Sequence, residues 1–119
     1  MGENKKSKKN LLRKRCPMCE RETYLRMTEA EMIQFGKYHY DGGLIQVQDR
    51  LPYMGVRERE FLVTGFCPDC QEKIFGTKHD KSNFIFMEND GDDRAKLLSE
   101  LGIENIYFID DKGYVVPEE

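Results

Sequence analysis

All four cysteines of this 119-residue chain belong to two copies of one short pattern, Cys-Pro-x-Cys. The first copy holds Cys16 and Cys19, and the second holds Cys67 and Cys70. Two residues between paired cysteines let both sulfurs of a tight turn face one ion, and tetrahedral zinc takes four thiolates at about 2.3 Å. Because the two pairs are far apart in the chain, metal binding would also contribute to folding. The pattern therefore predicts a structural zinc site with these four ligands.

Whether the four cysteines bind metal or form disulfide bonds depends on the cellular compartment in which the protein is found. The basic start of the chain, GENKKSKKNLLRKR, lacks the apolar segment of a secretory signal. No apolar run approaches the roughly 18 residues that a membrane-spanning helix needs. These features argue against a membrane protein and favour an intracellular location, where thiols are rarely joined in structural disulfides. The cysteines are therefore expected to bind metal.

Two alternatives to structural zinc are compatible with the cysteine spacing. A redox-active pair shares the pattern Cys-x-x-Cys, and iron could take the place of zinc. Rubredoxin-type knuckles carry glycine after the second cysteine, whereas this chain has Glu20 and Gln71 there, which weakens the iron interpretation. His39 and His79 could ligate metal or act as bases, but four thiolates already complete a zinc site.

The segment after the first cysteine pair predicts a strand and then a helix. Residues 23–27 alternate polar and apolar side chains, as a strand does. Thr28 and Glu31 have the spacing of a capping box, which marks the start of a helix. Asp41-Gly42-Gly43 would end this helix, whose apolar side includes His39.

Two glycines mark expected helix ends around the second cysteine pair. The segment VREREFLVTG is compatible with a helix that ends at Gly65 or with a strand, and the helix is preferred. Residues 71–75 are expected to form one helical turn that ends at Gly76.

The stretch GGLIQVQDRLPYMGVREREFLVTGFCPDCQEKIFG, together with the first CPMC, carries a resemblance. It resembles small uncharacterised zinc-ribbon proteins of bacterial phages and other mobile elements. In those proteins a Cys-Pro-x-Cys knuckle precedes a helix, and LIQ…LP and REFL-x-T-G-x-C-P-x-C segments close the site. The resemblance implies a zinc-binding fold and a phage setting, hence the cytoplasm of a bacterial host. It implies no particular activity, because such families mostly have none assigned.

The last forty residues predict a β-α-β-β arrangement. Its strands are expected at residues 84–87, 106–109 and 114–116. Asp90 or Asp92 would cap the helix between the first two strands, and Gly102 would end it. The connection is long enough for a right-handed parallel crossover, with the first strand in the centre of a sheet.

The expected fold class is therefore α+β, with a four-cysteine zinc-ribbon unit that contains inserted helices and is followed by the β-α-β-β unit. The expected boundaries are a basic flexible tail at residues 1–15, the zinc-ribbon unit at 16–79 and an acidic unit at 80–119.

Charge is distributed unevenly along the chain. Residues 1–15 hold seven basic side chains and one acid, while residues 80–119 hold eleven acids and four bases. A basic segment of this kind is typical of contact with phosphate backbones, although a disordered solubilising tail has the same composition. The candidate nucleic-acid-binding residues are Lys5, Lys6, Lys8, Lys9, Arg13, Lys14 and Arg15.

The acidic residues of the C-terminal segment suggest an enzymatic alternative. If the first two strands there are parallel, the carboxylates of Glu88 and Asp90 would converge with those of Asp110 and Asp111 at the carboxyl edge of the sheet. Converging carboxylates can hold Mg²⁺ for phosphoryl transfer or nuclease chemistry. The same acids also serve as helix caps and turn formers.

These observations favour a non-enzymatic, zinc-stabilised binding protein. We expect it to contact nucleic acid or a host nucleic-acid machine as a regulator or inhibitor. No nucleophile constellation stands out, since the cysteines are all assigned to metal. The oligomeric state is not predicted.

Overall fold

The computed structural model of the protein describes residues 8–40, 47–86 and 91–118. In chain order the elements are β1 (Asn10–Arg15), β2 (Glu22–Met27), α1 (Glu29–Tyr40), α2 (Val47–Arg50), α3 (Val56–Thr64), α4 (Pro68–Phe75), β3 (Phe84–Phe86), α5 (Gly91–Leu101), β4 (Asn105–Ile109) and β5 (Val115–Pro117). The fold is α+β, as the sequence predicts. Within the described ranges no helix combines the length and the apolar character needed to cross a membrane.

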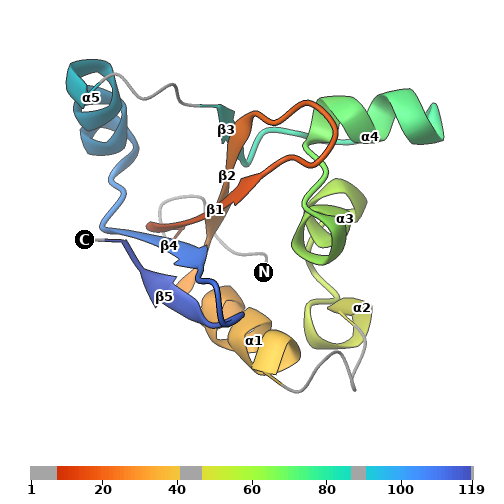
Figure 1. Ribbon diagram of the computed structural model, residues 1–119, viewed down its shortest axis with the longest axis horizontal. Coiled ribbons are helices and arrows are strands. Elements are labelled where there is room, and N and C mark those ends of the chain that lie inside the picture. Colours follow the sequence, from red (N-terminus) through yellow and green to blue (C-terminus); the bar gives the residue numbers. More distant parts are fainter. Residues whose placement is uncertain (1–7, 41–46, 87–90, 119) are drawn as a thin grey trace.

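The described strands form one mixed sheet in the order β3-β2-β1-β4-β5 (Figure 1). Strand β1 is central: it pairs antiparallel with β2, from Asn10↔Met27 to Arg15↔Glu22. On its other side it pairs parallel with β4, and the last pair is Arg13↔Phe108. Both outer pairings, β2 with β3 and β4 with β5, are antiparallel.

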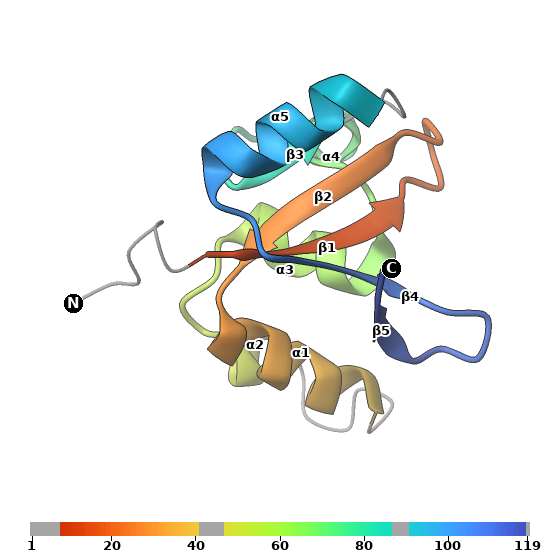
Figure 2. The same cartoon turned by 90° about the vertical axis from the view of Figure 1, so that its left-hand side faces the viewer.

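Helices cover both faces of this sheet (Figure 2). Leu11 and Tyr24 are buried on the face covered by α5, where partly buried Leu97 and Leu98 pack against them. Leu12 belongs to the larger core on the opposite face, together with residues of α1 and α3 such as Phe35 and Phe61. A strand with both faces covered needs apolar side chains at consecutive positions, and Leu11-Leu12 supplies them.

The prediction of a flexible tail over residues 1–15 is wrong for Asn10–Arg15. These residues are β1, the central strand of the sheet. The sequence does not indicate this strand, because three basic residues follow the two leucines and three consecutive cations are rare in a central strand. Here β1 tolerates Lys14 because its stem lies against the core while its ammonium approaches the rings of Phe35 and Phe61, 5.8 and 6.0 Å from their centroids.

The predicted division at residue 80 is not seen in the sheet. Strand β3 pairs with β2, and β4 pairs with β1, so residues assigned to three segments share one sheet and one core. The β-α-β-β order of β3, α5, β4 and β5 is confirmed. However, β3 is an edge strand rather than a central one, and β2 and β1 lie between it and β4.

The capping box at the start of α1 and the glycine ends of α3, α4 and α5 are confirmed. The predicted cap of α5 at Asp92 is wrong, because α5 begins at Gly91, and the alternative cap Asp90 lies outside the described residues. Thr28 and Glu31 form the capping box: the Glu31 N–H donates to Thr28 Oγ1 at 3.1 Å, and the Thr28 N–H donates to Glu31 Oε1 at 2.9 Å. Gly65, Gly76 and Gly102 adopt positive φ after α3, α4 and α5. Helix α4 is longer than expected, since it begins at Pro68. The predicted stop at residues 41–43 lies outside the described residues.

Candidate metal centre

The two cysteine pairs lie on different kinds of local structure. Cys16 directly follows β1, and the turn that contains Cys19 returns the chain to β2. Cys67 is the N-cap residue of α4, and Cys70 lies in the first turn of that helix. Gly65, with φ of 83°, turns the chain between α3 and α4 and packs close to the first turn. The antiparallel β1–β2 pair and the α3–α4 corner thus bring residues about fifty positions apart together.

The sulfur positions fit one tetrahedral ion. The four Sγ atoms all lie within 4.8 Å of one another. Cys19 Sγ and Cys67 Sγ, which come from different pairs, are 3.7 Å apart. Bonds of about 2.3 Å to a tetrahedral zinc ion place sulfurs about 3.8 Å apart, so this separation is compatible with a zinc ion. Among the described residues these cysteines are the single group of three or more potential ligands able to share an ion.

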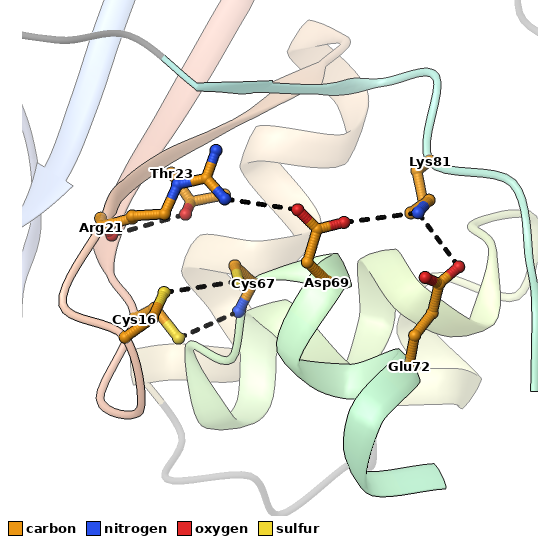
Figure 3. A network of polar contacts seen from close by, with 8 residues as sticks. Cys16, Arg21, Thr23, Cys67, Asp69, Glu72 and Lys81 are labelled. Atoms are coloured by element: carbon orange, nitrogen blue, oxygen red, sulfur yellow. Dashed lines mark hydrogen bonds and ion pairs between the residues drawn. The ribbon is translucent and has the colours of Figure 1, made fainter. Parts of the chain in front are cut away.

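Backbone amides and burial act in opposite directions on the thiols. Burial alone would raise the pKa of Cys16, but hydrogen bonds from the amides of Cys67, Cys19 and Met18 outweigh it and lower this pKa to about 6. The Cys67 N–H donates to Cys16 Sγ at 3.4 Å (Figure 3). Burial raises the pKa of Cys67 and of Cys70. Metal binding must therefore displace protons from the second pair.

A chain of ion pairs joins the two knuckles beside the sulfurs (Figure 3). Arg21, two residues after Cys19, donates to Asp69, which lies between the cysteines of the second pair, at 3.3 Å. Asp69 also accepts from Lys81 at 3.3 Å. Phe86 packs against the buried cysteines, and the Arg21 guanidinium lies 3.6 Å from the centroid of its ring. These contacts attach the first knuckle to the start of α4 and to the segment before β3.

The residues that follow each pair have different structural roles. Glu20 adopts φ of 63°, the left-handed conformation that favours glycine. Gln71 is fully buried inside α4, and its amide nitrogen donates to the carbonyls of Arg57 and Phe66, both at 2.9 Å. Glycine is therefore suited to position 20, whereas position 71 requires a long amide that ties α4 to α3.

The zinc-ribbon topology that the sequence predicts is not confirmed. The first pair lies between two paired strands, but the second pair begins a helix and is preceded by another helix. The four-cysteine cluster itself is present with the four predicted residues.

The predicted nucleic-acid-binding residues are placed in intramolecular contacts where the structure describes them. Lys8 forms a largely buried ion pair with Glu31, at 2.9 Å. The Lys14 ammonium donates to the Leu62 carbonyl at 2.8 Å, and burial lowers its pKa to about 8. The other three pairs are Lys9–Glu104 at 3.3 Å, Arg13–Glu118 at 3.1 Å and Arg15–Glu22 at 3.6 Å. Lys5 and Lys6 lie outside the described residues.

Strands β3 and β4, which precede the acids of the suggested Mg²⁺ site, are not neighbours in the sheet. Two strands separate them, which corresponds to about 14 Å. Asp110 Oδ1 instead accepts hydrogen bonds from the backbone amides of Lys112 and Tyr114, so it shapes the β4–β5 turn. Glu88 and Asp90 lie outside the described residues.

Among the described side chains, no histidine belongs to the cysteine cluster. His79 is exposed, in the segment between α4 and β3. His39 belongs to the last turn of α1, but its side chain is outside the described part of the structure.

The sequence alone did not indicate the roles of Arg21, Phe86 and Gln71, which surround the cysteines. The positions of Arg21 and Asp69 next to cysteines were visible in the sequence, but their pairing depends on how the two knuckles dock. Comparison with protein-family models, curated proteins and solved structures finds no significant match.

Proposed function

We propose that this chain is a non-enzymatic binding protein in which one zinc ion holds two knuckles together. The supporting observation is the closed donor set. Four thiolates complete a tetrahedral zinc ion and leave no position for water or substrate, which is typical of structural rather than catalytic zinc. The ion would attach α4 to the β1–β2 connection and so stabilise the fold around Cys16 and Cys67.

The partner we propose is a protein of a host nucleic-acid machine, which the chain regulates or inhibits in the bacterial cytoplasm. The resemblance to phage zinc-ribbon proteins supports the phage setting. The engagement of Lys8, Arg13 and Lys14 within the fold favours a protein partner over direct contact with phosphates. Tyr53, exposed at 96% between α2 and α3, is an aromatic side chain of the kind that anchors protein interfaces.

Zinc content is the first test. The purified chain should carry about one zinc ion, and Cys67→Ser should lose both the ion and cooperative unfolding, because it removes a buried ligand. Elemental analysis and thermal unfolding measure this. Iron in the analysis, or an unchanged melt for the variant, would contradict structural zinc.

Affinity capture from a bacterial lysate, with and without nuclease, tests the partner. A protein retained in both conditions and reduced by Tyr53→Ser supports the proposal; Tyr114→Ser, another exposed tyrosine, is the matched control. Loss of every partner after nuclease treatment would instead indicate nucleic-acid binding. In that case affinity should fall steeply with salt, by about 0.9 in log-log slope per phosphate contact.

A further inference from the structure

Exposure distinguishes one cysteine of the cluster from the other three. Cys16, Cys67 and Cys70 are buried, whereas Cys19 is exposed. Its neighbours Glu20 and Arg21 are exposed as well. Oxidants react first with thiolates that solvent can reach. Cys19 is therefore the sulfur of this site that a small oxidant meets first.

Cys19 also contacts the opposite knuckle. Its Sγ lies 3.7 Å from Cys67 Sγ, although the two residues are 48 positions apart. A disulfide bond is about 2.05 Å long, so the sulfurs need to approach by less than about 2 Å to form one. The exposed turn that carries Cys19 can supply such a movement more readily than Cys16, which is buried directly after the central strand β1.

We propose that Cys19 is an oxidation site: a hydroperoxide oxidises it in the zinc-bound protein, Cys67 then forms a disulfide with it, and the zinc ion leaves. This inference rests on the zinc site proposed above. The metal centre then responds to hydroperoxides in addition to holding the two knuckles together.

The reaction is balanced with the peroxide as the oxidant and the two sulfurs as the groups that are oxidised. The Cys19 thiolate attacks one peroxide oxygen, the O–O bond breaks, and an alkoxide or hydroxide leaves, which gives a sulfenic acid. The Cys67 thiolate then attacks this sulfur, the S–S bond forms, and hydroxide leaves. Two electrons pass from the sulfurs to the peroxide. Cys16 and Cys70 remain as two thiolates, which are too few to retain a structural zinc ion.

The product keeps the two knuckles connected. A Cys19–Cys67 disulfide joins the β1–β2 connection to the first residue of α4, as the zinc ion does. Oxidation would thus replace one cross-link by another and would free Cys16 and Cys70. A disulfide within one knuckle would leave the two knuckles unconnected, so the pairing decides whether the fold survives oxidation.

The test uses the full zinc-loaded chain and hydrogen peroxide. Elemental analysis first establishes the zinc content; a chain without zinc would refute the proposed function itself. Peroxide should then release about one zinc per chain, followed with a chromogenic zinc indicator. After alkylation, trypsin cuts next to Arg15, Arg21, Arg59 and Lys73, which places each cysteine pair in its own peptide. The expected product is a disulfide between these two peptides, with Cys16 and Cys70 alkylated.

Two variants, each with one cysteine replaced by histidine, distinguish the role of the exposed cysteine from that of a buried one. Cys19→His keeps a zinc ligand but removes the attacked sulfur, so it should retain zinc at a peroxide dose that empties the wild type. Cys16→His is the matched control and should still lose zinc. Zinc retention by the wild type, equal zinc loss from both variants, or a disulfide within one peptide would overturn the inference. If a variant does not load zinc, the wild-type peptide map decides.

Discussion

Leu11 and Leu12 are neighbours in β1, and both are completely buried, on opposite faces of the sheet. Leu11 packs in the cluster under α5, and Leu12 packs in the core under α1 and α3. Two adjacent side chains thus connect the two helical layers through one strand. Strand β1 is therefore the centre of the fold, although its composition is that of a solvated basic tail.

Truncation of either leucine should therefore destabilise the whole protein. We expect Leu11→Ala and Leu12→Ala each to lower the free energy of unfolding by about 2–5 kcal/mol, because each leaves a cavity in a packed core. Arg15→Ala in the same strand is the control and should change it by less than about 1 kcal/mol, since its ion pair is exposed. Urea unfolding measures all three. Near-neutral leucine variants would support a flexible tail instead.

Zinc uptake should release protons from the second cysteine pair. At about pH 7.5 the Cys16 thiol, with a pKa of about 6, is already ionised, whereas burial keeps Cys67 and Cys70 protonated. Zinc binds thiolates, so both buried protons must leave. Calorimetric titrations of the metal-free protein with zinc, in buffers of different ionisation enthalpy, count the protons. Uptake without proton release would show that the buried thiols are not ligands.

The two positions that follow the cysteine pairs should respond to glycine in opposite ways. Glu20→Gly should raise the free energy of unfolding by about 0.5–1 kcal/mol, because it relieves a left-handed backbone conformation. Gln71→Gly should lower it by about 2–4 kcal/mol, because it weakens α4 and leaves the carbonyls of Arg57 and Phe66 without their donor. Chemical denaturation of the zinc-loaded variants checks both. The same sign for both substitutions would refute this asymmetry.

Glu31 should contribute more to stability than the capping residue with which it pairs. Thr28→Ala should cost about 1 kcal/mol. Glu31→Ala should cost about 3 kcal/mol, because it also leaves the buried Lys8 ammonium without its partner. A double variant, Lys8→Met with Glu31→Leu, should recover part of this loss. The exposed pair Lys9–Glu104 offers the control, since Glu104→Ala should cost less than about 1 kcal/mol. Urea unfolding measures the free energy of unfolding of each variant. If Glu31→Ala and Glu104→Ala lower it equally, burial of the Lys8–Glu31 ion pair is contradicted.

The sequence alone determined the parts of this protein that depend on a few neighbouring residues. The spacing within each Cys-Pro-x-Cys pair identified the four residues that meet in one cluster, because a two-residue gap lets both sulfurs of a tight turn face one ion. The capping box of Thr28 and Glu31 and the stop at Gly65 were predictable for the same reason: a helix end is satisfied by side chains and backbone within one turn.

Only the tertiary structure decided the place of β1 and the partners of its charges. Leu11 is covered by α5, which lies some eighty residues further along the chain, and Leu12 by α1 and α3. Arg13 is paired with Glu118 near the other end of the sequence. Burial and charge neutralisation depend on which distant segments pack together, so a basic stretch that resembles a solvated tail became a central strand once its two leucines were covered on both sides.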